Sequence, residues 1–184
     1  MPGVQTTAQS VLAFWFGEID PQQWWAKSDA FDRQIAERFG DLHQAACRCE
    51  LHEWRETAAG RLAEIIVLDQ FSRNIHRDSP QAFASVAQAL ALAQTAVALG
   101  ADRQLEPRQR AFLYLPYMHS ESALIHTQAV ALFSQPGMEG NLDFELRHKA
   151  IIDRFGRYPH RNAILGRQST AEEIAFLQTP GSSF

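Results

Sequence analysis

The sequence predicts an all-α protein whose helices pack in antiparallel pairs. Apolar residues recur at intervals of three and four along almost the whole chain, and no segment shows the clean period of two expected of a half-buried strand. Glycine and proline separate these periodic segments at short intervals, which is typical of helices joined by short connections. A length of 184 residues fits one domain, so we expect a single all-α domain over residues 1–184.

The first half of the chain contains three predicted helices. Residues 29–47 place their apolar side chains on one face and their charged side chains on the others. Residues 62–69 are apolar on most sides, which indicates a deeply buried helix. Residues 83–97 are rich in alanine, which has a high helix propensity and lets neighbouring helices approach closely. Gly100 is the expected end of this third helix.

Two prolines shape the prediction for the second half of the chain. Pro107 can begin a helix, and we expect Pro116 to interrupt that helix after about two turns. A new helix then follows, with Ser120 as its N-cap and Glu121 in its first turn, where an acidic residue is favourable. The apolar face predicted for this helix consists of Leu124, Ile125, Gln128, Ala131 and Leu132.

Two further helices are predicted after residue 140. Residues 144–155 form the first of them, and Gly156 ends it. His148 lies on its apolar face, so we expect this side chain to be a hydrogen-bonded histidine of the core. A short helix then begins near Thr170, whose side chain forms a capping box with Glu173. The predicted apolar face of the 144–155 helix consists of Phe144, His148, Ile151, Ile152 and Phe155.

The composition is that of an ordinary globular protein. A hydrophobic content of 46% and a charged content of 21% argue against disorder. The net charge of −4 gives no general attraction to nucleic acid or to an anionic membrane, so neither is a predicted partner. We find no secretion signal and no apolar stretch as long as a membrane span, so the predicted location is the cytoplasm. The following residues are expected to be core or helix-packing aromatics rather than part of a cofactor site: Phe14, Trp15, Phe16, Trp24, Trp25 and Trp54.

The two cysteines, Cys47 and Cys49, are separated by a single residue. This spacing suits neither a disulfide-bonded secreted scaffold nor a four-ligand zinc site, which would need more partners. We therefore expect two free thiols in a reducing compartment.

The segment from Leu68 to Arg77 places polar residues at the end of a buried helix. Asp69 shares the apolar face of that helix, so its carboxylate points toward the core, where an unpaired charge is costly. Arg73 lies one turn further on and is the nearest candidate partner for an ion pair. A structural ion pair is favoured here over a catalytic role for Asp69.

A second polar segment, Tyr114 to Glu121, surrounds the predicted helix start after Pro116. The amides exposed at a helix N-terminus bind anions, and His119 and Glu121 beside them could act as acid and base. Simple capping by Ser120 is the favoured alternative. His126 could share a face with His119, but two histidines without a third ligand do not make a metal site.

The third segment is rich in arginine. Between Glu145 and Arg167 the chain has a net charge of +4, against −4 for the whole chain. Its loop combines arginine with glycine, histidine and aromatic residues, as a phosphate- or carboxylate-binding site would. A solvated basic face is the ordinary alternative. The basic residues of this segment are Arg147, Lys149, Arg154, Arg157, Arg161 and Arg167.

Several conspicuous stretches follow one another in a fixed order, namely Phe14-Trp15-Phe16, Leu68 to Asn74, Pro116 to Glu121, Arg154 to Asn162 and Leu165 to Thr170. Together they resemble a bacterial family known as domain of unknown function 924, over nearly the whole chain. The resemblance implies a tetratricopeptide-like fold, an α-α superhelix or bundle of antiparallel pairs. Ser72 stands where the family more often has proline, and Tyr158 where phenylalanine is usual. The family brings no established activity that the resemblance could transfer.

Two functions of different classes fit these residues. The first is a protein that binds a small anionic molecule carrying a phosphate or carboxylate, or a small enzyme, with the three polar segments around one pocket. The candidate catalytic residues are then His119, Glu121 and His160. The candidate ligand-binding residues are Asp69, Arg73, Asn74, Arg157, Arg161, Asn162 and Arg167.

The second function is a scaffold that binds a protein or peptide partner, as helical-pair domains often do. A third interpretation is a buried polar network that locks the last helices onto the first. We favour the pocket because arginine, histidine and carboxylates dominate the three segments, whereas peptide grooves are usually richer in apolar anchors. The sequence predicts no cofactor, and it leaves the ligand, the reaction and the oligomeric state open.

Overall fold

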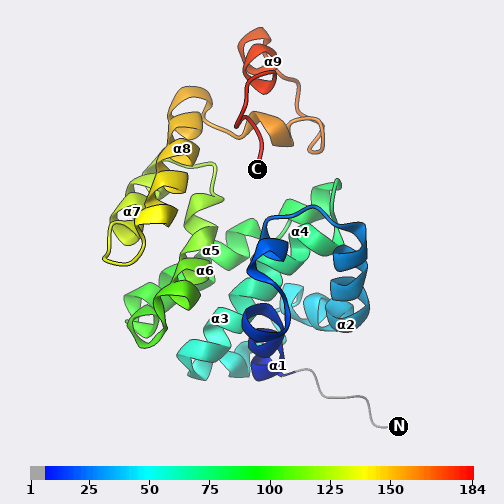
Figure 1. Cartoon of the computed structure of the whole chain (residues 1–184), viewed down its shortest axis with the longest axis vertical. Coiled ribbons are helices and arrows are strands. Elements are labelled where there is room, and N and C mark those ends of the chain that lie inside the picture. Colours follow the sequence, from blue (N-terminus) through cyan, green and yellow to red (C-terminus); the bar gives the residue numbers. More distant parts are fainter. Residues whose placement is uncertain (1–6) are drawn as a thin grey trace. The chain divides into compact units, whose positions relative to one another are not determined.

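The computed structural model describes residues 7–184, and these residues form helices and no strand, which confirms the predicted all-α class (Figure 1). Most of the connections are short and contain 3₁₀ turns. The α-helices are α1 (Ala8–Ala13), α2 (Asp29–Cys47), α3 (Ala58–Ile66), α4 (Ser72–Ile75), α5 (Val86–Ala98), α6 (Pro107–Met118), α7 (Ala123–Phe133), α8 (Glu139–Phe155) and α9 (Ala171–Leu177). The 3₁₀ turns are η2 (Pro21–Trp24), η3 (His52–Glu56), η5 (Pro80–Phe83), η6 (Ala101–Gln104) and η7 (Pro159–Arg161).

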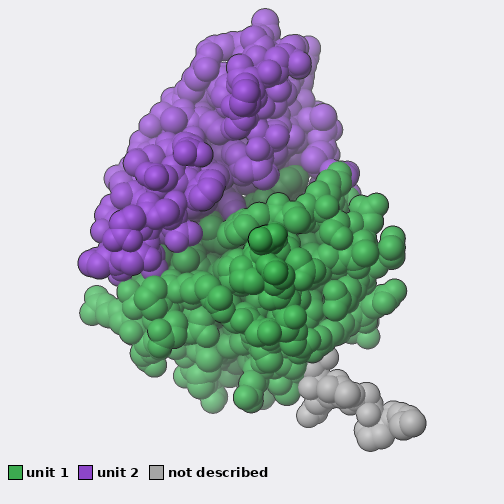
Figure 2. All heavy atoms as spheres, in the orientation of Figure 1, with its two compact units in different colours: residues 1–77, 81–116 green, residues 78–80, 117–184 purple. Residues whose placement is uncertain are grey.

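The chain divides into two compact units (Figure 2). Unit 1 comprises residues 1–77 and 81–116, and unit 2 comprises residues 78–80 and 117–184. The boundary in the second half of the chain falls inside α6, after Pro116. The single domain over residues 1–184 stays a prediction.

Unit 1 is organised around α3. Helices α1 and α5 pack against α3, and α2 packs against α4 and the turn that follows α3. Leu62, Ile65 and Ile66 are fully buried, which confirms the deep burial predicted for this segment. Helix α2 has the predicted bounds, and the hydroxyl of Ser28 caps it by accepting a hydrogen bond from the Phe31 N–H.

Unit 1 contains two π-helical turns. They are η1 (Phe14–Glu18), which follows α1, and η4 (Val67–Phe71), which follows α3. In η1 the N–H of Ile19 donates to the carbonyl of Phe14, five residues earlier, at 3.3 Å. The rings of Trp15 and Phe71 lie 5.5 Å apart, so the two turns contact each other through buried aromatic side chains. Such turns are rare and frequently mark functional sites, and apolar periodicity did not predict either one.

Unit 2 contains the helical pair α7 and α8, which lie side by side (Figure 1). A connection of residues 134–138 joins them, so the two helices run antiparallel, as the sequence predicts. Helix α9 packs against η7. The core of this unit is formed by Ile151, Ile152 and Tyr158, with Phe155 and Phe176 packed against it.

The predicted break at Pro116 and the predicted cap at Ser120 are wrong. Helix α6 continues through Pro116 to Met118, because the missing N–H falls in the last turn and removes only one hydrogen bond. The next helix begins at Ala123, with Ser122 in the N-cap position. Ser120 is instead buried before that helix.

The predicted buried faces of two helices in unit 2 also need correction. In α7 the buried residues are His126, Ala129 and Phe133, whereas Leu124 is 70% exposed. This segment is apolar on nearly all sides, so periodicity could not select its buried face. In α8, Phe144 is exposed, although His148, Ile151 and Ile152 are buried as predicted.

The aromatic residues near the N-terminus divide between core and surface. Phe14 and Trp15 are fully buried, as predicted. Trp25 is 66% exposed, which excludes the core alternative for this residue and leaves the helix-packing one. It follows Trp24 at the end of η2, and its ring stacks on that of Phe112 at 5.9 Å.

Two helical glycines make a matched pair for testing the packing of unit 1. A Cβ on Gly60 would lie 2.0 Å from the carbonyl oxygen of Trp54, whereas a Cβ on Gly40 would meet no atom within 4 Å. We expect Gly60→Ala to lower the free energy of unfolding by about 1–3 kcal/mol and Gly40→Ala to raise it by about 0.5–1 kcal/mol. Urea denaturation measures both values, and equal stability of the two variants would contradict the close approach of α3 to Trp54.

Candidate functional site

The first polar segment lies in unit 1, where η4 continues into α4. Asp69 is only 2% exposed, and its Oδ2 accepts a hydrogen bond from the side-chain amide of Gln70 at 2.7 Å. Arg73 Nε lies 4.0 Å from Asp69 Oδ1, which confirms the predicted ion pair one helical turn apart. The guanidinium of Arg73 also lies over the ring of Phe83, at 5.4 Å.

Asn74, the third candidate of this segment, has its partner at the start of α2. Its side-chain amide donates to Asp32 Oδ1 at 2.8 Å, and Arg77 Nη2 donates to the same oxygen at 2.8 Å. Burial raises the pKa of Asp32, but the hydrogen bonds from Arg77 and Asn74 outweigh this effect and the net pKa is lowered. Asn74 therefore helps to hold an ionised carboxylate between α4 and α2.

The second and third polar segments meet in unit 2, at the carboxylate of Glu121. Arg167 donates to both of its oxygens, from Nη1 at 2.7 Å and from Nη2 at 2.9 Å. The backbone N–H of Tyr158 donates to Oε1 at 2.7 Å. Burial raises the pKa of Glu121, but these hydrogen bonds outweigh it and lower the pKa, so the carboxylate is ionised at neutral pH.

Three more candidates lie close to this ion pair. Arg161 is 3% exposed, donates from Nη2 to the backbone carbonyl of His119 at 3.0 Å, and lies 4.5 Å over the ring of Tyr158. Asn162 is also buried, and its Oδ1 accepts a hydrogen bond from Arg167 Nε at 2.9 Å. The segment around His119 and the arginine-rich loop are thus neighbours in unit 2.

Arg157 is paired with α9 rather than with another candidate. Its Nε and Nη2 donate to the two oxygens of Glu173 at 2.7 and 2.8 Å. The hydrogen bond from Arg157 is the main reason why the pKa of Glu173 falls to about 2. Glu173 also accepts from the N–H of Thr170, whose hydroxyl accepts from the N–H of Glu173, and this confirms the predicted capping box.

Two histidines of unit 2 surround the buried ring of Tyr158. His160 is half-buried, and its ring lies 5.8 Å from that of Tyr158 and 4.5 Å from that of Phe184. His148 is buried, and its Nδ1 lies 2.7 Å from the carbonyl of Phe144. This hydrogen bond confirms the prediction of a hydrogen-bonded core histidine.

Asp69, Arg73 and Asn74 belong to unit 1, whereas His119, Glu121, His160 and the other candidates belong to unit 2. The meeting of all three segments around one pocket stays a prediction.

Unit 2 also contains a buried chain of polar groups that the sequence did not predict. His126 Nδ1 lies 2.7 Å from Glu145 Oε1, and its Nε2 lies 2.8 Å from the carbonyl of Ser120 and 3.1 Å from the hydroxyl of Tyr158. That hydroxyl donates to the carbonyl of Met118 at 2.5 Å. His126, Glu145 and Tyr158 are all fully buried. A histidine in the middle of an apolar helix was the signal, but its partner lies nineteen residues further along the chain.

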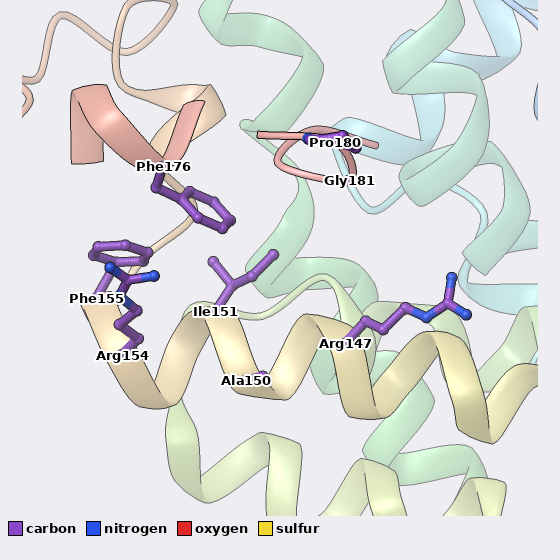
Figure 3. A pocket seen from close by; sticks show the side chains of 8 residues that line it. All are labelled: Arg147, Ala150, Ile151, Arg154, Phe155, Phe176, Pro180 and Gly181. Carbon is purple, nitrogen blue, oxygen red and sulfur yellow. The ribbon is translucent and has the colours of Figure 1, made fainter. Parts of the chain in front are cut away.

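Unit 2 also contains a hollow between α8 and the segment around α9 (Figure 3). Its volume is about 570 Å³, within the usual range of ligand pockets. Arg147 and Arg154 lie toward its two ends on α8, and Ile151 lies between them (Figure 3). The hollow is lined by Arg147, Ala150, Ile151, Arg154, Phe155, Phe176, Pro180 and Gly181.

The two arginines of the hollow are held more loosely than those of the loop. Arg154 pairs with Glu172 at 2.8 Å, and both side chains are more than half exposed. The guanidinium of Arg147 lies 5.6 Å from the ring of Phe144, and within residues 7–184 no carboxylate pairs with it. Both arginines belong to the predicted basic segment, but neither is among the predicted ligand-binding residues.

The sequence matches the family described as bacterial protein of unknown function (DUF924) over residues 11–181. The chain belongs to this family. It is also similar to a solved structure of a protein of unknown function from Agrobacterium tumefaciens, with 38% identity and a TM-score of 0.88. That match covers 93% of this chain and 96% of the other. No match was found among curated proteins.

This member of the DUF924 family shows no arrangement of three or more His, Cys, Asp or Glu side chains suited to a metal ion, within the part of the chain that the structure describes. Over the same residues, none of the helices combines the length and the apolar character that a bilayer crossing requires.

The contact between His126 and Glu145 predicts a pH dependence of stability. A carbonyl only accepts hydrogen bonds, so the His126 Nε2 facing Ser120 carries a hydrogen, and the 2.7 Å contact of Nδ1 with Glu145 needs a further proton. Burial raises the pKa of Glu145, and this effect outweighs the lowering by His126. The folded pair therefore retains a proton that glutamate in the unfolded chain loses above about pH 4.3.

Because the folded state binds more protons, this stabilisation is complete below the unfolded pKa and is lost as the pH rises through the folded pKa. We expect the free energy of unfolding of the wild type to fall relative to Glu145→Gln as the pH rises above about 4.3, by at most about 1.4 kcal/mol per pH unit. The amide of the variant can donate to Nδ1 without titrating. A difference independent of pH, measured by urea unfolding, would show that the pair holds no extra proton.

Proposed function

We propose that unit 2 binds a small molecule with one anionic group and an apolar body, in the hollow between α8 and α9. The hollow itself carries the proposal, because its two guanidinium groups flank an apolar surface formed by Ile151, Phe155 and Phe176 (Figure 3). A carboxylate or phosphate would be held by Arg147 or Arg154 in a charge-assisted hydrogen bond, while the apolar body covers Ile151 and the phenylalanines.

Arg147 is the better anchor for the anionic group. Its guanidinium contacts the ring of Phe144 and has no carboxylate to give up, within the residues that the structure covers. Arg154 would first have to release Glu172, but an ion pair as exposed as this one contributes only about 0–1 kcal/mol. Both arginines are therefore available to a ligand at little cost.

Arg157 and Arg167, which the sequence analysis selected as ligand-binding residues, support this site indirectly. Arg157 holds α9 through both oxygens of Glu173, and Arg167 is bound to both oxygens of Glu121. We infer that they position the segment carrying Phe176. Glu121 is ionised and already bonded to Arg167 and Tyr158, which favours binding over proton transfer as the role of this carboxylate.

The test compares two cationic residues of the same helix. Octanoate supplies a carboxylate on an apolar chain, and octanol serves as its uncharged counterpart. We expect Arg147→Ala to weaken octanoate binding about tenfold, which corresponds to about 1.4 kcal/mol, measured by isothermal titration calorimetry. Lys149→Ala removes the same charge outside the hollow, from a side chain bonded to Asp153 at 2.5 Å, and should change the affinity less than twofold.

Equal losses in the two variants would mean that octanoate responds only to the net charge of α8, and the proposed site would be wrong. Equal affinities for octanol and octanoate would show that the arginines do not bind the carboxylate.

A second candidate function, binding of a protein partner, rests on the aromatic surface at η2. Trp25 is 66% exposed, and Arg108 lies 5.3 Å over the ring of Trp24 and 5.5 Å over that of Phe16. Exposed tryptophan beside arginine is the residue combination enriched in interaction hot spots. The partner that fits is a peptide segment with an apolar anchor for Trp25 and an acidic residue for Arg108.

Photo-crosslinking tests this surface in the intact chain. A photoreactive phenylalanine analogue at position 25 should give one discrete crosslinked product in cells. Arg108→Glu should remove that product, because the reversed charge repels an acidic partner. A product that survives the charge reversal would contradict the proposed partner chemistry.

A further inference from the structure

The two cysteines lie at the end of α2, against the first residues of α5. Cys47 is exposed, and its Sγ lies 3.4 Å from the hydroxyl of Ser85, the N-cap residue of α5. The same Sγ lies 3.6 Å from Nε2 of His43, which precedes Cys47 by one helical turn. An accessible thiol thus lies beside the N-cap hydroxyl at the positive end of a helix.

The hydrogen bonds around His43 show which atoms can donate to the thiolate. Ser72 donates its hydroxyl hydrogen to the carbonyl of Leu68 at 2.6 Å, so it must accept at its 2.7 Å contact with His43 Nε2. His43 therefore carries its hydrogen on Nε2, the ring nitrogen nearer to Cys47 Sγ. That hydrogen is donated to Ser72, so the hydroxyl of Ser85, 3.4 Å away, is the group placed to donate to Cys47 Sγ.

The neighbouring cysteine occupies a backbone position that favours glycine. Cys49 has φ +60°, and it ends α2 in a Schellman motif, with hydrogen bonds from the N–H of Cys49 to Ala46 and from the N–H of Glu50 to Ala45. A residue with a Cβ is strained in this region by about 1–2 kcal/mol.

The Sγ of Cys49 also faces the beginning of α5. It accepts a hydrogen bond from Gln88 at 3.3 Å, and Gln88 lies one turn after Ser85 on the same face of that helix. The guanidinium of Arg55, which is bonded to Glu64, also interacts with Cys49. Both sulfur atoms are therefore near one face of α5, each in contact with a polar side chain of that helix end.

We propose that Cys47 and Cys49 form a peroxide-reactive dithiol, in which Cys47 is oxidised first and Cys49 resolves the product. The Cys47 thiolate attacks one oxygen of hydrogen peroxide, the O–O bond breaks, and an S–O bond forms. The departing hydroxide takes up a proton and leaves as water. Cys49 then attacks the sulfur of the sulfenic acid, so that an S–S bond forms and the S–O bond breaks. The departing hydroxide takes the proton of the Cys49 thiol and leaves as a second water. In a reducing compartment, cellular thiols return the disulfide to two thiols.

The experiment uses the reduced full-length chain, hydrogen peroxide and a thiol-blocking quench, followed by intact mass measurement. We expect the wild type to lose two hydrogens and to stay monomeric on a non-reducing gel. Trypsin cleaves after Arg48, between the two cysteines, so the peptides on either side should remain joined until a reductant is added.

The two single cysteine variants provide the matched control. Cys49→Ser should gain one oxygen on Cys47, trapped by dimedone, whereas Cys47→Ser should be oxidised at least about tenfold more slowly. Ser85→Ala removes one donor with a small change in volume, and we expect it to slow the oxidation of Cys47 severalfold while circular dichroism shows an unchanged helix content. Faster oxidation of Cys49 than of Cys47, a disulfide between two chains, or unreacted thiols in the wild type would each overturn the proposal.

Discussion

The carboxylate of Glu121 is the contact on which the arrangement of the candidate residues in unit 2 depends. The loop after α8 is irregular, so its backbone N–H and carbonyl groups need partners outside regular helices. Glu121 accepts hydrogen bonds from the N–H of Tyr158 and from both terminal nitrogens of Arg167. The Nε of Arg167 in turn donates to the side-chain oxygen of Asn162. A single acidic side chain therefore fixes both ends of the loop that carries Arg161. Removal of Arg167 would leave this half-buried carboxylate without its countercharge.

The sequence predicted those helix ends and caps that are determined by residues close together in the chain. The bounds of α2, the glycine end of α8 at Gly156 and the capping box at Thr170 all follow from residues within a few positions of one another. The buried face of α7 did not follow, because most of its residues are apolar and the contact of His126 with Glu145 decides which face is inside. The π-turns could not be predicted either, because apolar periodicity does not distinguish a π-helical turn, which has one extra residue, from an α-helical turn.

The sequence predicted which types of residue form the candidate site, but not which arginine is bonded to which carboxylate. The sequence shows an excess of basic over acidic residues between residues 145 and 167. Which arginine is already bonded depends on partners distant in the chain, such as Glu121, which lies 46 residues before Arg167. Arg147 differs from Arg167 because no carboxylate pairs with it in the described chain, and no local pattern around it reveals this. Composition therefore located the basic region, and the contacts select the residues within it.

The π-turn η4 connects two features that are far apart in the sequence. The turn ends immediately before Ser72, and the carbonyl of Leu68 within it receives the hydroxyl hydrogen of that serine. Ser72 can then only accept from His43, which fixes the hydrogen of the imidazole on the nitrogen nearer to Cys47. The pKa of His43 is lowered to about 4, mainly by burial and further by His76, so the ring is neutral, donates to Ser72 and gives Cys47 no countercharge. A backbone irregularity in one helix thus determines the tautomer of a histidine that lies beside a thiol in another.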